Sequence, residues 1–261
     1  MTYRTDYHVH STFSDGRAIP EEYISPAISA GLSEIGFSEH LTLYREEDEW
    51  FMKRENLSLY LNKIDELRKA NDRIVVRTGF EVEYFRGREK ETGDFLKSLP
   101  LDYIIGSVHY LGEWSVDHRA DFYEGRNIDD LFESYFNEVC AAAESGLFDI
   151  IGHCDLIRIY GYRPSTDPEP HYRKLAKSMK KGDVAFEVNT NGRNRPLADF
   201  YPDRRFLGVF RDENIPVCVN SDAHMPSRVG QYFNEAYELL RYIGFTEMAV
   251  FENRKRKMIP F

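Results

Sequence analysis

Two histidines near the N-terminus have the spacing of a metal-binding pair. His8 and His10 are two residues apart, and in a β-strand residues two apart project from the same face. Neutral imidazole is the commonest protein ligand for divalent transition metals. Asp15 follows in a turn of serine, aspartate and glycine that can bring its carboxylate over the pair. Two unrelated surface histidines would give the same pattern, so the hypothesis of a metal site depends on the rest of the chain.

Further histidines and acidic residues follow the other predicted strands. Short apolar runs rich in β-branched residues predict strands at 33–37, 74–76, 103–109, 148–153, 184–189 and 216–220. Candidate ligands close most of them, and the full set is His8, His10, Asp15, His40, Glu81, His109, His153, Asp222 and His224. Clustering of this kind at strand ends indicates metal. Because about four to six ligands saturate one zinc, manganese or iron ion, we expect two or three divalent ions.

Predicted helices alternate with these strands. Helical spacing and helix-start signals mark residues 20–31, 55–70, 129–145, 170–181 and 203–213. This alternation indicates parallel β/α units, and neither a glycine-rich dinucleotide loop nor a Walker-type phosphate loop follows any strand. We therefore expect one α/β domain over residues 1–261. It should be a barrel of about seven units with its active site at the carboxyl ends of the strands.

Composition argues against several other classes of protein. The 261-residue chain is 42% hydrophobic and 30% charged, which is typical of a globular protein. No apolar run approaches the roughly 20 residues of a membrane helix, so we expect a cytoplasmic protein without membrane contact. The formal net charge of −10 argues against nucleic acid as a partner. The one basic cluster, residues 254–257, is predicted to be a solvated tail or helix end.

The motifs around the candidate ligands resemble one known family. They are HVHS (8–11), SDG (14–16), GFSEH (36–40), GFE (79–81), GSVH (106–109), GH (152–153) and NSDAH (220–224). Together they resemble the polymerase-and-histidinol-phosphatase (PHP) family over nearly the whole chain. The runs GSVHY (106–110), DLIR (155–158) and EVNT (187–190) look most similar to the stand-alone histidinol-phosphate phosphatases of that family.

The resemblance implies a distorted seven-stranded (β/α) barrel with three metal positions. The first would take His8, His10, Glu81 and Asp222. The second would share Glu81 and add His109 and His153. The third would take Asp15, His40 and His224, and these three residues would also be catalytic. Zinc, manganese and iron all remain open as the metal, as does the oligomeric state.

The implied reaction is hydrolysis of L-histidinol phosphate to L-histidinol and phosphate in histidine biosynthesis. A phosphate monoester dianion repels hydroxide and has a poor alkoxide leaving group, so the site must neutralise charge and stabilise the departing oxygen. A metal-bridged hydroxide would attack phosphorus. A third ion or a nearby protonated histidine would assist the leaving oxygen.

Three arginines are candidates for binding the substrate phosphate, since the guanidinium fork suits phosphate oxygens. Arg158, five residues after His153, is the first candidate. The similar phosphatases usually carry Gly-Leu-Arg-Lys-Pro where this chain has Gly-Arg-Asn-Arg-Pro (192–196). Either Arg193 or Arg195 could therefore reach inward, and a surface position is the alternative for each of the three.

Two further groups of residues are expected near the site. Trp114, Tyr160 and Tyr162 could stack on a substrate imidazole, although aromatic residues more often pack in the core. Glu39 and Glu83 neighbour the candidate ligands and could orient ligating histidines from behind. Neither glutamate is expected to bind metal directly.

Three alternative functions remain open at this stage. The first is a PHP phosphodiesterase or phosphoesterase acting on nucleotides, nucleic acid or another small phosphate. The second is a phosphotyrosine-protein phosphatase, which would need a shallower and more open site. The third is a degenerate PHP module with a binding or structural role, and the complete ligand set argues against it.

Overall fold

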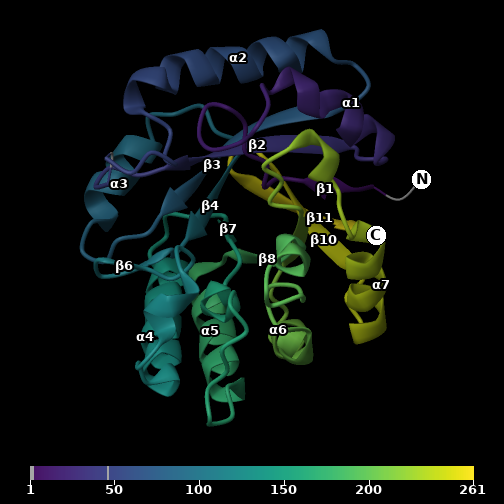
Figure 1. Ribbon diagram of the computed structural model, residues 1–261. Helices are drawn as coiled ribbons and strands as arrows, with labels where there is room; N and C mark the ends of the chain where they lie inside the picture. Colours follow the sequence, from purple (N-terminus) through teal and green to yellow (C-terminus); the bar gives the residue numbers. More distant parts are fainter. Residues whose placement is uncertain (1–2, 46) are drawn as a thin grey trace.

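The structure is a computed structural model that describes residues 3–45 and 47–261. Its centre is a seven-stranded parallel sheet with the strand order β1-β2-β3-β4-β7-β8-β9 (Figure 1). The strands are β1 (Thr5–Asp6), β2 (Glu34–Leu41), β3 (Val75–Glu83), β4 (Tyr103–Ser107), β7 (Ile150–Ile151), β8 (Ala185–Asn189) and β9 (Val217–Asn220). The predicted parallel α/β architecture is confirmed.

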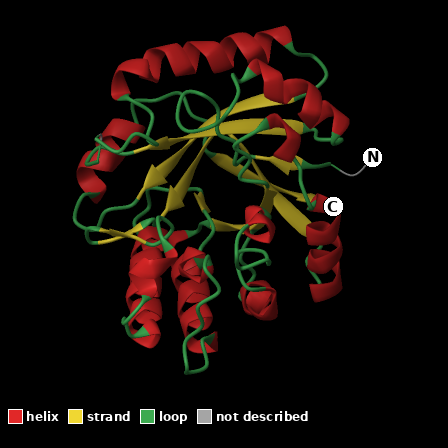
Figure 2. Cartoon of the chain, in the orientation of Figure 1, coloured by secondary structure: helices red, strands yellow, loops and turns green. Residues whose placement is uncertain are grey.

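The sheet curls until its first and last strands meet. Val9, just after β1, forms a parallel bridge with Ala223, just after β9. The His10 amide donates to the Ala223 carbonyl at 3.0 Å, and the Ala223 amide donates to the His8 carbonyl at 3.1 Å. The result is a nearly closed, distorted barrel (Figure 2). Closure brings the N-terminal histidine pair beside residues 222–224, although more than 200 residues separate them in the chain.

Seven helices lie around the outside of the strands in the described part of the chain (Figure 1). They are α1 (Glu21–Ser29), α2 (Leu57–Ala70), α3 (Glu89–Leu96), α4 (Ile128–Glu144), α5 (Glu169–Gly182), α6 (Leu207–Asp212) and α7 (Phe233–Ile243). In α4 the buried residues Phe132, Tyr135, Phe136 and Val139 recur at helical spacing. The Asn127 side chain caps this helix by accepting from the Asp129 amide at 3.0 Å.

The barrel interior is filled by a small cluster around Tyr103. This cluster contains Tyr7, Tyr103, Ile105, Ile150, Ala185, Cys218, Ala249 and Phe251. The Tyr103 hydroxyl donates to the carbonyls of Tyr7 at 2.7 Å and Phe37 at 3.0 Å. Its ring occupies the space above Gly36 and Gly79, where an added Cβ would lie only 2.4 Å from Tyr103 atoms. The interior is therefore a packed core that supports the strand ends.

The basic cluster at residues 254–257 was wrongly predicted to be a solvated tail or helix end. It begins the second strand of an antiparallel hairpin formed by β10 (Glu247–Glu252) and β11 (Lys255–Pro260). Arg254 pairs with Asp149, and Arg256 donates to the Asp183 carbonyl at 2.8 Å. Charged residues on the open face of β11 hide the strand pattern, whereas the buried centre of β10 packs under the barrel.

The predicted helices agree with α1, α2, α4 and α5 within a few residues. Residues 203–213 contain a short 3₁₀ turn (Arg204–Phe206) followed by α6. Helices α3 and α7, the β10–β11 hairpin and a small hairpin of β5 (Tyr110–Leu111) and β6 (Trp114–Ser115) were not predicted. Among the described residues, no helix combines the length and apolar composition needed to cross a membrane.

Candidate metal centre

All nine predicted ligands converge at the carboxyl ends of the barrel strands. His40 and Glu81 lie near the ends of β2 and β3. Asp15 lies in the turn that follows the histidine pair after β1, and the others come within four residues of the ends of β1, β4, β7 and β9. Most of these side chains are buried, including His8 and His10 at 0% exposure and Glu81 at 1%. Asp15 and His224 are the most accessible of the nine, with side-chain exposures of 32% and 25%.

Glu81 lies at the centre of the cluster. Its Oε2 atom is 3.1 Å from His8 Nε2, 3.5 Å from His10 Nε2 and 2.7 Å from His40 Nδ1. Its Oε1 atom is 2.8 Å from His153 Nε2 and 3.7 Å from His109 Nε2. One carboxylate thus faces five imidazoles, which is the geometry of a ligand shared by two metal positions.

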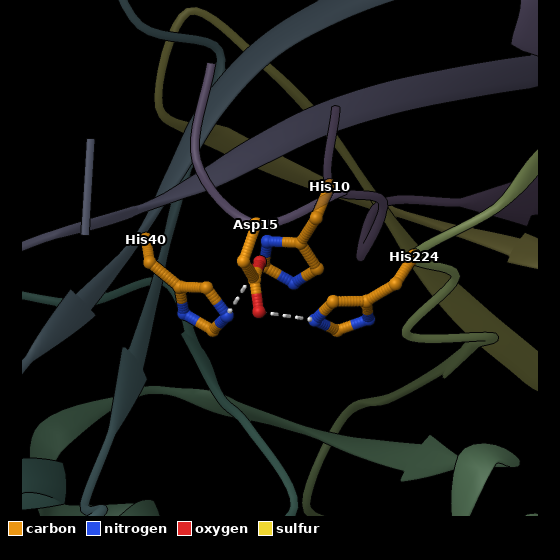
Figure 3. Close-up of side chains that lie close together, drawn as sticks. All are labelled: His10, Asp15, His40 and His224. Carbon is orange, nitrogen blue, oxygen red and sulfur yellow. Dashed lines mark ion pairs between the residues drawn. The ribbon is translucent and has the colours of Figure 1, made fainter. Parts of the chain in front are cut away.

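A second carboxylate joins the histidines on the open side of the cluster. Asp15 lies between His40 and His224, with oxygen-to-nitrogen distances of 3.5 and 3.3 Å (Figure 3). The His10 ring stacks on His40 with a centroid separation of 4.1 Å. His10, Asp15, His40 and His224 each offer a donor atom within 4.8 Å of the others.

Asp222 completes the opposite side. Its Oδ1 atom is 3.5 Å from His10 Nε2 and 3.8 Å from His8 Nε2. The sets His8–His10–Asp222, His8–Glu81–His153 and His40–Glu81–His109 also bring their donor atoms within 4.8 Å. With the Asp15 set these make four overlapping groupings, and His8, His10, His40 and Glu81 each belong to two of them.

Unpartnered buried atoms show that the cluster fits metal ions. Among the described residues, His8 Nε2, both ring nitrogens of His10, His40 Nδ1, His153 Nδ1 and Glu81 Oε2 are buried and make no contact with the geometry of a hydrogen bond, although Glu81 Oε2 lies close to three of these nitrogens. Leaving one such group unsatisfied costs about 1–3 kcal/mol. Imidazole nitrogens and carboxylate oxygens are the donors that zinc, manganese and iron accept. Divalent ions would therefore satisfy the atoms that the protein leaves unpaired.

The electrostatics of the cluster hold His10, Glu81 and Asp222 in the protonation states that bind metal, a neutral imidazole and two ionised carboxylates. Burial and the neighbouring imidazoles of His40 and His224 lower the pKa of His10 to about 3, so this ring is neutral near pH 7. Burial opposes ionisation of Glu81, but His8 and His40 hold its pKa well below the usual value. Asp222 is likewise held ionised, against burial, by His8 and His10.

His8 behaves differently. Burial disfavours its charged form, but the carboxylates of Glu187, Glu81 and Asp222 outweigh that cost and raise its pKa well above the usual value. Without an ion, His8 therefore carries a proton that a metal must displace. This makes metal binding at His8 dependent on pH.

Glu187, a residue of β8, holds the ligands from behind and was not singled out for this role. Its Oε2 atom is 3.0 Å from His8 Nδ1, and its Oε1 atom accepts from the His153 amide at 2.7 Å. Asn189 and Asn220 donate to the same carboxylate at 2.8 Å each. A buried glutamate in the middle of a predicted strand was the available signal, since such a charge requires partners.

Glu83 and Glu39 have different supporting contacts. Glu83 Oε2 lies 2.6 Å from His109 Nδ1, as expected for a residue that orients a ligand. Glu39 instead accepts from the Ser11 amide at 3.1 Å, from the Ser11 hydroxyl at 2.6 Å and from the Ser14 hydroxyl at 2.5 Å. Glu39 therefore holds the turn that carries Asp15, whereas Glu83 holds a histidine.

The cluster forms one side of a cleft of about 340 Å³. Asp15, His40, His109, His153, Asp222 and His224 all line it. The remaining wall includes Trp50, Tyr110, Asn191 and Tyr201, together with the acidic residues Asp48, Glu49 and Asp117 and one arginine, Arg195. The cleft thus joins a candidate metal site to a wall that is mainly acidic and aromatic.

The three arginines predicted to bind phosphate lie in different places. Arg195 lines the cleft. Arg193 pairs with Glu235 at 3.2 Å, outside the cleft lining. Arg158 was the first candidate, but the structure buries it in an ion pair with Asp155 at 2.6 Å and keeps it out of the cleft lining. A short 3₁₀ turn after Asp155 directs this guanidinium toward nearby carboxylates.

The aromatic side chains expected to stack on substrate also pack elsewhere. Trp114 lies edge-on to Tyr123 at a centroid distance of 5.0 Å, and Tyr162 stacks on the same ring at 4.8 Å. Tyr160 contacts Tyr123 as well. The tryptophan of the cleft is Trp50, 4.7 Å from the His40 ring. It lies in a loop without periodicity, so no pattern in the sequence marks it.

A family model described as the PHP domain matches residues 6–191. The chain belongs to the PHP family. The match includes seven of the nine candidate ligands of this PHP chain, and Asp222 and His224 lie beyond its end. The resemblance stated from the sequence motifs is therefore confirmed.

Several relatives of this PHP chain have names that describe their activity. It is 36% identical to a protein named probable histidinol-phosphatase from Deinococcus radiodurans, with both chains covered completely. It is 26% identical to a protein named histidinol-phosphatase from Lactococcus lactis, over 97% of this chain and 96% of the other. The crystal structure of the Lactococcus lactis histidinol phosphate phosphatase with zinc, L-histidinol and phosphate matches with a TM-score of 0.86, covering 97% of this chain and 98% of that one.

Proposed function

We propose that this chain is a metal-dependent phosphomonoesterase that hydrolyses L-histidinol phosphate to L-histidinol and phosphate in histidine biosynthesis. The observation that carries the proposal is the cleft, which brings six members of the nine-residue donor cluster together with Arg195 and an acidic wall. Two relatives named histidinol-phosphatase, aligned over at least 96% of both chains, support the choice of substrate.

We assign the nine donors to three ion positions. His8, His10, Glu81 and Asp222 would hold one ion, and Glu81, His109 and His153 a second. Asp15, His40 and His224 would hold a third. Zinc is bound in the Lactococcus lactis structure, and manganese and iron suit the same donors. Divalent ions in these positions supply charge neutralisation, a nucleophile near neutral pH and stabilisation of the leaving oxygen.

The more accessible residues of the cluster are proposed to act on the leaving group. Asp15, His40 and His224 all line the cleft, where a bound substrate can reach them. Burial disfavours the charged form of His224, but the carboxylates of Asp15 and Asp222 outweigh it and raise its pKa to about 9. Where no ion occupies this position, the His224 imidazole can hold a proton for the leaving oxygen.

The acidic wall suits the organic part of histidinol phosphate. That molecule carries an ammonium group and a basic imidazole beside its single phosphate. Asp48, Glu49 and Asp117 place negative charge in the cleft wall for such groups, and Trp50 and Tyr110 add aromatic rings to the same wall. The same charges would repel the repeated phosphates of nucleic acid. A small phosphorylated metabolite is therefore the favoured partner.

The assay that tests this proposal compares phosphate release from L-histidinol phosphate with release from phenyl phosphate, a bis-aryl phosphate diester and a phosphotyrosine peptide. We expect the zinc-loaded protein to prefer histidinol phosphate. In Asp117→Asn, KM for histidinol phosphate should rise roughly 5-fold, because one partly exposed charge pair is worth about 1 kcal/mol. KM for phenyl phosphate, which has no cationic group, should be unchanged.

Asp121→Asn is the matched control, because Asp121 lies four residues further on in the 3₁₀ turn Ala120–Tyr123, pairs with Arg119 and is not part of the cleft lining. It should leave both KM values unchanged. Similar slow rates on every monoester would reject histidinol phosphate as the substrate. Preference for the diester or the phosphopeptide would favour one of the other PHP activities.

Replacing the arginine of the cleft should weaken the binding of every phosphate monoester. Arg195→Met should lower kcat/KM about 10- to 100-fold on both histidinol phosphate and phenyl phosphate, since a hydrogen bond to a charged group is worth about 1.5–3 kcal/mol. The paired variant Arg193→Met should change kcat/KM less than about 3-fold, because Arg193 pairs with Glu235 outside the cleft lining. Equal effects of the two variants would contradict the assignment of Arg195.

A further inference from the structure

The Tyr201 hydroxyl is a buried polar group without a partner at the edge of the cleft. The side chain is 1% exposed and lines the cleft. Within the described residues, its hydroxyl makes no hydrogen bond. Most buried hydroxyl groups in folded proteins are paired, so an unpaired one beside a binding site calls for a ligand.

The backbone around Tyr201 holds this side chain in a defined position. The Tyr201 amide donates to the Asn189 carbonyl at 3.1 Å, and the Asn189 amide donates back to the Tyr201 carbonyl at 2.7 Å. The ring lies over Gly192, where an added Cβ would be 3.0 Å from the ring. Gly192 thus leaves room for the ring, and the bridge to Asn189 attaches it to the end of β8.

The surroundings of Tyr201 belong to the candidate active site. Its ring lies 6.3 Å from that of His153, at 72°. Charges on two sides act on its hydroxyl, those of Arg195 and Asp222 in the cleft wall and those of the buried pair Asp155 and Arg158 outside it. Asp222 is assigned to an ion and Arg158 pairs with Asp155, so among these residues the hydroxyl and Arg195 are the ones left to face a bound phosphate.

We propose that the Tyr201 hydroxyl donates a hydrogen bond to a phosphate oxygen of the substrate, next to the contact made by Arg195. This inference rests on the proposed phosphatase function. A phosphate bound to the ions presents further oxygens that need donors from the protein. A fixed neutral hydroxyl supplies one without adding charge, and it needs no rearrangement during the reaction.

The test compares Tyr201→Phe with Tyr135→Phe in the zinc-loaded protein. Tyr135 on α4 is the matched control, because its hydroxyl is also buried and unpartnered but is not part of the cleft lining. The measurements are the Kd of inorganic phosphate, kcat and KM on histidinol phosphate, zinc content and Tm. Inorganic phosphate tests the contact even if histidinol phosphate is not the substrate.

For Tyr201→Phe we expect phosphate binding and kcat/KM to weaken about 10- to 100-fold. Zinc content should be unchanged and Tm unchanged or higher, because the variant removes an unsatisfied buried group. Tyr135→Phe should leave phosphate binding and kcat/KM unaltered. If the wild-type protein binds phosphate but does not turn over histidinol phosphate, the proposed substrate is wrong. The phosphate Kd values of the wild type and of Tyr201→Phe would then still decide whether the Tyr201 hydroxyl contacts phosphate.

Three results would overturn the inference. The first is phosphate affinity in Tyr201→Phe within about 2-fold of the wild-type value. The second is a loss of zinc or a clear fall in Tm in this variant, which would assign the hydroxyl a structural role. The third is the absence of phosphate binding by the zinc-loaded wild-type protein.

Discussion

Glu81→Gln will remove most of the phosphatase activity and part of the bound metal. The Glu81 carboxylate faces five imidazoles within 3.7 Å, and no other described residue joins the two sides of the cluster in this way. Glutamine keeps the shape of the side chain but removes its charge and one acceptor oxygen. Residues that only orient a ligand cost about 10–100-fold when replaced, so we expect a shared ligand to cost on the order of 10³-fold in kcat/KM.

Metal analysis and kinetics on Glu81→Gln check this prediction. Glu83→Gln is the matched comparison, because Glu83 lies on the same strand and contacts His109 without being a proposed ligand. It should lose only about 10–100-fold and retain its metal. If Glu81→Gln kept its full metal content and lost less than about 10-fold in activity, the assignment of Glu81 as a shared ligand would be wrong.

Removal of the metal will both abolish activity and lower the melting temperature. Chelation leaves several buried nitrogens and one carboxylate oxygen of the cluster without partners, and ions that bind only the folded protein stabilise it by about 2.7 kcal/mol at 100 times their Kd. For a chain of this size, that corresponds to a fall in Tm of roughly 5–10 °C. Scanning calorimetry of dialysed and zinc-reconstituted protein measures the difference, and protein treated with the zinc–chelator complex is the control.

The pH dependence of zinc binding follows from His8. Three carboxylates, acting against burial, raise the pKa of His8 well above its usual value in the metal-free protein. Zinc must displace this proton, so the affinity for zinc should fall as the pH is lowered, and binding should release a proton to the buffer.

For both metal predictions, an unchanged Tm and full activity after complete chelation would contradict the role of metal altogether.

The positions of the candidate ligands could be predicted from the sequence because strand ends leave a strong local signal. Apolar β-branched runs mark strands, and in a parallel barrel all their carboxyl ends face the same side. His40, Glu81, His109 and His153 are therefore close in space wherever the exact strand boundaries fall. The β1 strand is only two residues long. At this strand the two-residue spacing of His8 and His10 was the signal that predicted the ligands.

Loop residues were predicted less well, because loops have no period that fixes the direction of a side chain. Arg158 and Arg195 were equivalent candidates by residue type, yet Arg158 lies near the carboxylates of Asp155, Asp199 and Asp203 and is kept among them. For the same reason Trp114, which was expected near the substrate, packs on Tyr123, whereas Trp50, for which nothing was predicted, lines the cleft. The β10–β11 hairpin escaped prediction because the alternation of β11 is concealed by charged residues on its exposed face.

The sequence alone determined the family, the parallel α/β architecture and the set of candidate metal donors, since these depend on residue types at strand ends. Only the tertiary structure decided how those donors meet and what surrounds them. Closure of the barrel between Val9 and Ala223 places both ends of the chain in one site. Burial then decides which polar groups are left for a ligand: Arg158 is paired inside the protein, whereas Arg195 and the Tyr201 hydroxyl remain at the cleft.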